Sequence, residues 1–408
     1  MVRPGSPDEV AALLRACRDA GAHVTVQGGR TSLVAGTVPE HDDVLLSTER
    51  LTGISEVDAT ERRVRTGAGV PLATVQRAAA AAGLVFGVDL AARDSATVGG
   101  MASTNAGGLH TIRYGDMREQ VAGIDIVLPD GSFVQRRSEV RCDNTGYDLT
   151  SLFVGAEGTL GVITELDLWL RPAPGHRLTA LCGFADLNSL IEDARQFADD
   201  SNIAALELID GRGAALAAQR LGIAVPISTA WLLLIELAGS VDPTDQLAAM
   251  VGGANLAAPP AVGADAAAQQ RLWQVRESLA QVVGLFGPPL KFDVSLPLSA
   301  IPSFADRSTA LVADHAPDAI PVLFGHVGQG NLHLNVLRCD GAAERHLYEA
   351  MLNLIAAQGG NISSEHGIGS RKRDYLGLSR QPGDVAAMRT IKAAFDPTGY
   401  LNPAVLFD

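Results

Sequence analysis

Near its beginning the chain carries the glycine-rich turn Gln27-Gly28-Gly29-Arg30-Thr31-Ser32-Leu33-Val34-Ala35-Gly36. Short strand patterns at residues 24–27 and 43–47 flank the turn, and a capped helical pattern at residues 7–20 precedes it. Adjacent glycines lack Cβ atoms, so their backbone N–H groups can converge on an anion such as a pyrophosphate. The turn is neither Gly-x-Gly-x-x-Gly nor a Walker loop, which argues against a Rossmann fold. Taken by itself, it could also be a plain turn.

Two further segments combine glycines with small or hydroxyl-bearing residues, namely Ser95-Ala96-Thr97-Val98-Gly99-Gly100-Met101-Ala102-Ser103-Thr104-Asn105-Ala106-Gly107-Gly108 and Gly155-Ala156-Glu157-Gly158-Thr159-Leu160-Gly161-Val162-Ile163-Thr164. The first is too polar for a core strand. Small side chains let a flat ligand approach the backbone closely. Each segment alone is a weak signal, but together with the first turn they favour a ligand channel over three unrelated loops.

The predicted secondary structure changes after Arg171-Pro172-Ala173-Pro174-Gly175. Short strands and turns precede this segment, and longer alanine-rich helical patterns follow it, as at residues 190–199 and 245–251. We therefore predict an α+β protein with domains at residues 1–172 and 173–385 and a C-terminal segment at 386–408. Residues 254–268 are rich in Ala, Pro and Gly, which predicts a loop.

The composition limits the possible partners. The chain has 32 basic and 46 acidic residues among its 408, a formal net charge of -14, which opposes binding to nucleic acid or to an anionic membrane surface. An anionic substrate must therefore be attracted by local basic residues. The four cysteines form no Cys-x-x-Cys pair, so we expect them to be reduced. No apolar run approaches the ~20 residues of a membrane helix, and no signal peptide pattern is present, so we expect a cytoplasmic protein without a membrane span.

The glycine-rich motifs, together with Asp143-Asn144-Thr145-Gly146-Tyr147-Asp148-Leu149, resemble the FAD domain of the vanillyl-alcohol-oxidase, or PCMH, type. Within that superfamily the chain is similar to the FAD-binding D-2-hydroxy acid dehydrogenases. That group includes D-2-hydroxyglutarate dehydrogenase, D-lactate dehydrogenase and the FAD subunit of glycolate oxidase, and the D-2-hydroxyglutarate members match best. The resemblance implies a PCMH-type FAD-binding domain of two subdomains, followed by an α+β cap domain with an antiparallel sheet.

The resemblance also implies which residues hold FAD. They are Gln27, Gly28, Gly29, Arg30, Thr31, Ser32, Ser95, Thr97, Gly99, Gly100, Ser103, Thr104, Ala106, Gly107, Glu157, Gly158, Gly161, Ile163 and, near the C-terminus, Asn402. Members with covalent flavin attach it to a histidine, and His110 is the nearest candidate here. Since members with non-covalent flavin share the adjacent Arg113-Tyr114-Gly115, we interpret His110 as a surface or supporting histidine and predict non-covalent FAD.

Two histidines lie in the segment Gly325-His326-Val327-Gly328-Gln329-Gly330-Asn331-Leu332-His333-Leu334-Asn335-Val336, and Ser363-Ser364-Glu365-His366-Gly367-Ile368-Gly369 adds a glutamate and a third histidine. On a strand, His333 and Asn335 share one face while the alternating apolar residues face the core. Two imidazoles and a carboxylate are a typical ligand set for catalytic zinc. Histidines near strands are more often ordinary core or surface groups, but the resemblance maps His326, His333 and Glu365 onto metal ligands.

The resemblance further implies a mechanism. Arg276, Lys291, Asn335 and His366 would bind the substrate, and His366 would be the catalytic residue. Coordination of the substrate hydroxyl to zinc or a similar ion lowers its pKa, so that neutral His366 can take the proton while hydride passes from Cα to flavin N5. The implied reaction oxidises a D-2-hydroxy acid, such as D-2-hydroxyglutarate, D-lactate or D-malate, to the 2-oxo acid. For each cation alone, a solvated surface charge remains the alternative.

Two positions depart from the relatives' pattern. Ala280 replaces a threonine one helical turn after Arg276, and Gln329 replaces an aspartate. The sequence does not identify the electron acceptor, for which relatives suggest an electron-transferring flavoprotein, a quinone or a cytochrome, and a homodimer is one possible assembly. The alternative functions are a zinc hydrolase without flavin, a flavoprotein that serves only electron transfer, and an oxidase or glycolate-oxidase-type subunit with another acceptor.

Overall fold

The computed structural model describes residues 1–40, 42–137, 140, 142–339 and 341–407. The chain forms two compact units: the first unit combines residues 1–173 with 365–408, and the second unit is continuous over residues 174–364. The sequence-based borders at 172 and 385 count residues 365–385 with the second domain instead. Asp408, at the end of the predicted segment 386–408, lies outside the described residues.

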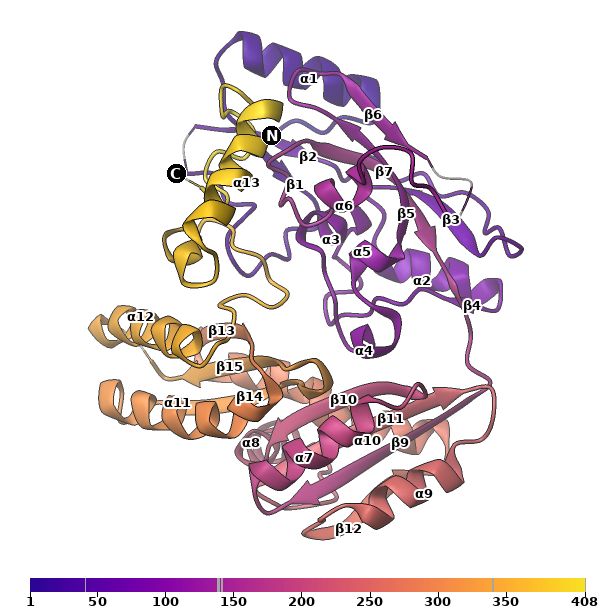
Figure 1. Ribbon diagram of the computed structural model, residues 1–408, viewed down its shortest axis with the longest axis vertical. Helices are drawn as coiled ribbons and strands as arrows, with labels where there is room; N and C mark the ends of the chain where they lie inside the picture. Colours follow the sequence, from indigo (N-terminus) through magenta and orange to yellow (C-terminus); the bar gives the residue numbers. More distant parts are fainter. Residues whose placement is uncertain (41, 138–139, 141, 340, 408) are drawn as a thin grey trace. The chain divides into compact units, whose positions relative to one another are not determined.

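The first unit contains a four-stranded antiparallel sheet and two smaller pairs of strands (Figure 1). The four-stranded sheet has the order β3-β7-β5-β6, β1 and β2 pair in parallel, and β4 pairs with β8. The strands are β1 (Val24–Gln27), β2 (Val44–Ser47), β3 (Arg63–Gly67), β4 (Leu84–Val85), β5 (Val121–Val127), β6 (Phe133–Arg136), β7 (Val162–Trp169) and β8 (Arg171–Pro172).

Short helices surround these strands. They are α1 (Pro7–Asp19), α2 (Leu72–Ala81), α3 (Val98–Thr104), α4 (Thr111–Tyr114), α5 (Met117–Gln120), α6 (Leu149–Phe153), the 3-10 turn η4 (Arg373–Leu378) and α13 (Pro382–Phe395). Helix α1 begins as its sequence predicts, because the Ser6 side chain accepts the Glu9 N–H and Pro7 occupies the first turn. Tyr400 and Leu401 are buried in the same hydrophobic core as α1, so the end of the chain is part of the first unit.

A seven-stranded antiparallel sheet of order β12-β9-β11-β10-β14-β15-β13 organises the second unit (Figure 1). Its strands are β9 (His176–Phe184), β10 (Ile203–Asp210), β11 (Trp231–Gly239), β12 (Ala258–Gly263), β13 (Leu290–Ser295), β14 (Ile320–His326) and β15 (Asn331–Leu337). The central strands β10 and β11 are apolar along nearly their whole length and buried on both faces, which requires helices on both sides of the sheet. This sheet confirms the predicted α+β class.

The helices of the second unit form two groups. They are α7 (Leu187–Ala198), α8 (Gly211–Leu221), α9 (Thr244–Gly253), α10 (Ala266–Val282), α11 (Ile301–His315) and α12 (Ala342–Ala357), with 3-10 turns η1 (Val283–Phe286), η2 (Leu298–Ala300) and η3 (Val327–Gln329). Helices α8 and α10 pack together on the sheet face that carries Ile209 and Phe324. Helix α11 packs against α7 and α12, and these three also contact the sheet.

The prediction of a loop at residues 254–268 is wrong. The structure places strand β12 there, and α10 starts within the same stretch with the Asp265 side chain accepting the Ala268 N–H. Strand β12 lies at the edge of the sheet, where Pro259 and Pro260 can be accommodated because one side of the strand needs no ladder hydrogen bonds. Its pairing with β9 also shifts register between Ala258 and Ala261. An irregular edge strand can therefore have the same low-complexity composition as a loop.

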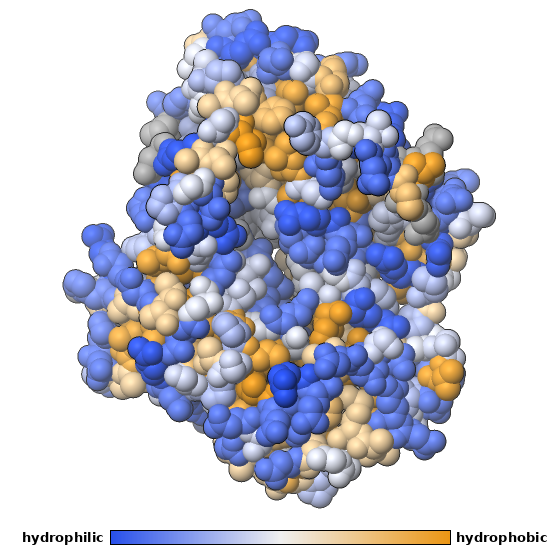
Figure 2. All heavy atoms as spheres, in the orientation of Figure 1, coloured by the Kyte–Doolittle hydropathy of each residue, from blue (hydrophilic) through white to orange (hydrophobic). Residues whose placement is uncertain are grey.

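Other features agree with the composition. Cys17, Cys142, Cys182 and Cys339 are all free, as predicted. Hydrophilic residues cover most of the face seen in Figure 2, and apolar residues are scattered among them. Among the residues that the structure describes, none of the helices has the length and apolar content that a membrane crossing requires.

Candidate functional site

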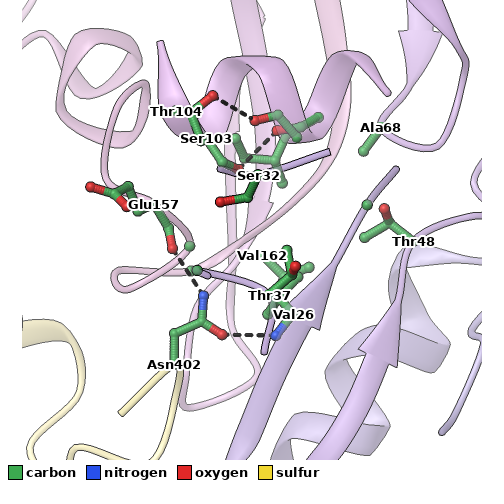
Figure 3. Close-up of a pocket in the computed structure, with 17 residues that line it drawn as sticks. Val26, Ser32, Thr37, Thr48, Ala68, Ser103, Thr104, Glu157, Val162 and Asn402 are labelled. Carbon is green, nitrogen blue, oxygen red and sulfur yellow. Dashed lines mark hydrogen bonds between the residues drawn. The ribbon is translucent and has the colours of Figure 1, made fainter. Parts of the chain in front are cut away.

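A pocket in the first unit brings the three glycine-rich segments together (Figure 3). It contains about 590 Å³ of empty space, its open mouth included. The walls come from β1 and the turn that follows it, from α3, from residues 157–163 and from the C-terminal segment. The lining residues are Val26, Gly28, Ser32, Gly36, Thr37, Thr48, Ala68, Gly99, Gly100, Ser103, Thr104, Glu157, Gly158, Gly161, Val162, Ile163 and Asn402.

Glycines are required in this pocket because backbone packs on backbone. A Cβ atom on Gly29 would lie 1.9 Å from the Ser95 carbonyl oxygen, and one on Gly99 would lie 2.5 Å from the Ala68 Cβ. Larger residues would push the first turn and helix α3 away from their neighbours. The glycine motifs thus bring three distant segments to the same pocket.

Asn402 fastens the C-terminal segment to the pocket wall. Its Oδ1 accepts the Val26 N–H at 2.7 Å, and its Nδ2 donates to the Glu157 carbonyl at 2.9 Å, as Figure 3 shows. The backbone N–H of Asn402 also donates to the Val24 carbonyl. One buried amide side chain therefore joins β1 to the loop that carries Glu157.

The Glu157 carboxylate holds the segment that returns to the first unit. It accepts the backbone N–H groups of Ile368 at 2.9 Å and Gly369 at 2.8 Å. A Cβ atom on Gly367, whose φ is +81°, would lie 2.9 Å from this carboxylate, so glycine is needed there. Burial raises the pKa of Glu157 above its usual range, and the two N–H donors offset only part of that effect.

The pocket includes eleven of the nineteen residues predicted to hold FAD: Gly28, Ser32, Gly99, Gly100, Ser103, Thr104, Glu157, Gly158, Gly161, Ile163 and Asn402. The other eight are outside its lining: Gln27, Gly29, Arg30, Thr31, Ser95, Thr97, Ala106 and Gly107. Gln27 and Thr97 still support the pocket, since Gln27 donates to the Thr37 carbonyl and Thr97 caps α3. His110 lies at the start of α4 with its ring edge to face with that of Tyr114.

Sequence reasoning missed pocket residues at the ends of strands, notably Val26 and Thr48. The available signal was positional. Thr48 directly follows β2, and its backbone N–H donates to the Gln27 carbonyl at the end of β1. Residues at the ends of paired strands lie beside a turn even when they are not part of the glycine motif.

A second group of polar residues lies on one face of the second unit's sheet. Partners in antiparallel pairs have side chains on the same face, and the register gives three neighbouring rows on β13, β15, β14 and β10. The rows are Lys291–Asn335–Val322, then Asp293–His333–Phe324–Ile209, then Ser295–Asn331–His326–Glu207. This polar patch, meaning the polar members of these rows, contains four of the predicted site residues: Lys291, Asn335, His333 and His326.

Glu207 connects His326 to Arg276. Its Oε1 lies 2.5 Å from His326 Nδ1, and its Oε2 accepts from Arg276 Nε at 2.6 Å. Glu207 is fully buried, which alone would raise its pKa, but His326 and Arg276 outweigh burial and lower the pKa to about 2. The carboxylate is therefore a permanent negative charge between a predicted metal ligand and a predicted substrate ligand.

His333 has a similar carboxylate partner. Its Nδ1 lies 3.6 Å from Asp293 Oδ1, and the His326 and His333 ring centroids are 5.4 Å apart. Burial lowers the pKa of His333, even though Asp293 acts in the opposite direction, and this favours the neutral imidazole. An imidazole that donates Nδ1–H to a carboxylate carries its lone pair on Nε2, the arrangement typical of a metal ligand. His326 has this arrangement, since its Nδ1 lies 2.5 Å from the Glu207 carboxylate, whereas the 3.6 Å between His333 and Asp293 is longer than a hydrogen bond.

The predicted substrate ligands differ in exposure. Arg276 is buried on α10, with its guanidinium 4.7 Å from the centroid of the Phe324 ring. Asn335 is buried and Lys291, its partner across the strands, is exposed. Ala280 is also exposed, although it lies one turn after Arg276 on the same helix. The idea that Ala280 and Arg276 face one pocket therefore stays a prediction.

The chain itself constrains Glu365 and His366. Ser364, the last residue of the second unit, donates its backbone N–H to Asp293 Oδ2 at 3.0 Å. Glu365 and His366 follow it directly, and Ile368 and Gly369 are then held by Glu157. Glu365 also lies near Gly107, where an added Cβ would be 3.1 Å from its Oε1. Hydrogen bonds to the backbone therefore hold the chain both before and after these two residues.

Sequence reasoning missed Glu207 and Asp293. Each acid has apolar neighbours on both sides within its strand, Ile203–Asp210 or Leu290–Ser295, and each is almost completely buried. A buried acid needs a charged or hydrogen-bonding partner, so its presence in such a strand is a usable signal. The sequence could not name the partner, because that depends on the order and register of the strands.

Comparisons with known proteins agree with this architecture. Residues 1–136 match the FAD binding domain, and residues 173–406 match the FAD linked oxidases, C-terminal domain. The chain resembles the crystal structure of p-cresol methylhydroxylase with bound substrate, with a TM-score of 0.81 and 17% identity over 100% of this chain and 88% of that one. This likeness confirms the predicted PCMH-type fold.

Closer relatives cover nearly the whole chain. D-2-hydroxyglutarate dehydrogenase of Xanthomonas citri pv. viticola is 35% identical over 99% of this chain and 88% of its own length. The mitochondrial D-2-hydroxyglutarate dehydrogenase of Bos taurus is 34% identical over 99% of this chain and 76% of its own. The matched domains confirm FAD as the cofactor and an oxidoreductase as the class of enzyme. The chain therefore belongs to the family of FAD linked oxidases.

Proposed function

We propose that this enzyme oxidises a D-2-hydroxy acid, such as D-2-hydroxyglutarate, to the 2-oxo acid, with zinc or a similar divalent ion at His326, His333 and Glu365. One observation carries the proposal. Two histidines, the buried His326 with its Nδ1 2.5 Å from the Glu207 carboxylate and the partly buried His333 beside Asp293, lie on one sheet face near Arg276, in a chain that also has an FAD-binding domain. Relatives over nearly the full chain are D-2-hydroxyglutarate dehydrogenases.

The donor set fits the proposed metal. Two imidazoles with carboxylate partners and a third ligand from Glu365 leave room for a substrate oxygen, as in catalytic zinc sites. When bound, the metal supplies Lewis acidity toward the substrate hydroxyl, and FAD supplies a hydride acceptor. The surrounding carboxylates of Glu207 and Asp293 also compensate the positive charge that would be concentrated at the histidines.

The protein's own residues then bind and deprotonate the substrate. Arg276, Lys291 and Asn335 offer two cations and one amide to the carboxylate groups of an anion, which an acidic protein could not otherwise attract. His366 accepts the hydroxyl proton, a role suited to a neutral imidazole. The acceptor that reoxidises FAD stays a prediction, with an electron-transferring flavoprotein, a quinone or a cytochrome as the candidates.

An anaerobic flavin-reduction assay tests this proposal. The zinc-loaded protein is mixed with D- and L-enantiomers of 2-hydroxyglutarate, malate and lactate, and bleaching of the flavin band is followed. We expect at least one D-acid to reduce the flavin stoichiometrically and the L-acids to fail. Reduction by L-acids alone, or by none of the acids, would contradict the proposed substrate class. A hydrolase is disfavoured by the FAD-binding domain.

A further inference from the structure

We infer that Glu207 is a positioning residue that orients two site residues at once, the metal ligand His326 and the anion-binding Arg276. The inference rests on the proposed function and deepens it. Metal affinity and affinity for the substrate's carboxylate would then depend on the same buried side chain. No contact of Glu207 with substrate or cofactor is required, because it acts through its two partners.

The position of Glu207 supports this role. It lies on the central strand β10, whose register makes it the direct partner of His326 on β14. Its exposed fraction is 0%, and each carboxylate oxygen is used by a different partner, with contacts of 2.5 Å and 2.6 Å. A side chain enclosed in this way cannot rotate without losing one of the two contacts.

Glu207 also fixes the plane of the Arg276 guanidinium. Nε is bonded to the carboxylate, and Phe324 lies 4.7 Å from the guanidinium carbon. A guanidinium held at Nε and against a ring keeps its two terminal nitrogens as a rigid pair of donors, which suits a carboxylate bound through two parallel hydrogen bonds. Phe324 in turn meets the His333 ring edge to face, at a centroid distance of 5.6 Å.

The chemistry of glutamate explains why an amide would not replace it. Both partners donate hydrogen bonds, Nδ1–H from His326 and Nε–H from Arg276, so the side chain must accept on both of its terminal atoms. Glutamine accepts on one atom and donates on the other, so it must lose one partner or force the His326 tautomer to change. Glu207→Gln therefore disturbs positioning with almost no change in volume.

Two other buried acids provide matched controls. Asp293 lies beside His333, with its Oδ1 3.6 Å from His333 Nδ1, and its Oδ2 accepts the Ser364 N–H. Glu236 on β11 also binds a cation and a residue of α10, since it accepts from Arg177 and from Trp273 Nε1, both at 2.7 Å. Asp293→Asn therefore changes the carboxylate beside His333, and Glu236→Gln changes the contacts of β11 with Arg177 and with α10.

The experiment compares Glu207→Gln, Asp293→Asn and Glu236→Gln in the FAD-loaded full chain. Zinc affinity is measured by competition with a chromophoric chelator, and the affinity for 2-oxoglutarate is measured at saturating zinc from the change in the flavin spectrum. We expect Glu207→Gln to weaken zinc binding by about 10–100-fold, as for the loss of a histidine's carboxylate partner, and 2-oxoglutarate by about 10-fold. Asp293→Asn should weaken zinc alone, and Glu236→Gln should change neither affinity.

Several outcomes would overturn the inference. Zinc and 2-oxoglutarate affinities of Glu207→Gln within about 2-fold of wild type would do so, as would equal loss of both in Glu236→Gln. If Glu207→Gln does not fold, Glu207→Asp, which keeps the charge but withdraws the carboxylate, should weaken both affinities, and unchanged affinities would be contrary to the inference. A wild-type protein that binds neither zinc nor another divalent ion would instead refute the proposed function, and the inference with it.

Discussion

Glu157 in the first unit and Glu207 in the second are both enclosed acids beside predicted site residues, yet their pKa values change in opposite directions. Burial dominates at Glu157, where two backbone N–H donors and the charge of Lys372 offset only part of its effect, and the pKa is raised. At Glu207 the same penalty is outweighed by His326 and Arg276, and the pKa falls to about 2. The surroundings of a carboxylate therefore decide whether burial raises or lowers its pKa, and at Glu207 an arginine and a histidine in direct contact keep the acid charged.

The two units therefore hold their predicted site residues in place differently. The first unit holds backbone in place with glycines and amides, as at Gly29 and Asn402, which suits a large neutral ring system with a phosphate chain. The second unit holds charged side chains in place with other charges, which suits a metal and an anion. Five substitutions test this contrast, beginning with the largest expected effect.

His326→Ala should abolish zinc binding and turnover but leave FAD in place, because the predicted FAD residues belong to the other unit. Elemental analysis, the flavin spectrum and a turnover assay measure the three properties. His315→Ala, which changes an exposed histidine on α11, is the control and should keep all three. Loss of FAD from folded His326→Ala would show that the two halves are not independent.

His366→Asn should retain both zinc and FAD and lose about 10²–10⁴-fold in the rate of flavin reduction, since the proton of the substrate hydroxyl has no acceptor. Single-turnover mixing under anaerobic conditions isolates this step. The segment that carries His366 is held through Ile368 and Gly369, so the variant should fold normally. A rate equal to that of wild type would assign the proton transfer to another residue.

Arg276→Ala should destabilise the protein by about 3–5 kcal/mol, because it removes one partner of a buried ion pair and leaves Glu207 with less compensation. It should also sharply lower kcat/KM for every D-2-hydroxy acid that the enzyme accepts. Chemical unfolding measures the first effect and steady-state kinetics the second. Arg177→Ala, whose side chain is 36% exposed, should cost much less stability because solvent screens its pair with Glu236.

Ala280→Thr supplies the matched kinetic control for Arg276→Ala on the same helix. A restored hydroxyl can add one neutral hydrogen bond, so KM for a dicarboxylate should change by about 10-fold at most. A larger effect at this exposed position would mean that the residue faces the substrate directly. Equal effects of the two substitutions on KM would contradict the proposal that Arg276 binds the substrate's carboxylate.

Glu157→Gln should have the smallest effect, and that effect should depend on pH. A folded-state pKa above the ordinary 4.5 means that the protonated acid is favoured in the native protein. The corresponding stability is present below the ordinary pKa and is lost as pH rises through the raised value. The Tm advantage of wild type over Glu157→Gln should therefore shrink as pH rises from 4 to 8. An advantage that grows with pH would show that the ionised form is the stabilised one.

The sequence predicted which polar and glycine-rich segments form the candidate sites, but it did not predict which buried side chains contact them. Alternation correctly placed His333 and Asn335 on one strand face, and the glycine motifs contained ten of the eleven predicted FAD residues that line the pocket. Glu207 was missed because its partners lie 69 and 119 residues further along the chain, and only strand order brings them together. The error at residues 254–268 has another cause, because an edge strand tolerates prolines that would break a central one.

The discontinuous first unit imposes an order on biosynthesis. During translation the second unit, continuous from 174 to 364, is complete before the first unit's last residues have been made. The pocket wall still lacks Asn402, and the hydrophobic core still lacks Tyr400 and Leu401. Strand β1 is synthesised among the first thirty residues. Its Val24 forms a parallel bridge with Leu401, so this pairing cannot form until the end of the chain has been made. Flavin capture is therefore a late step, which the ribosome cannot complete until residue 402 has left its exit tunnel.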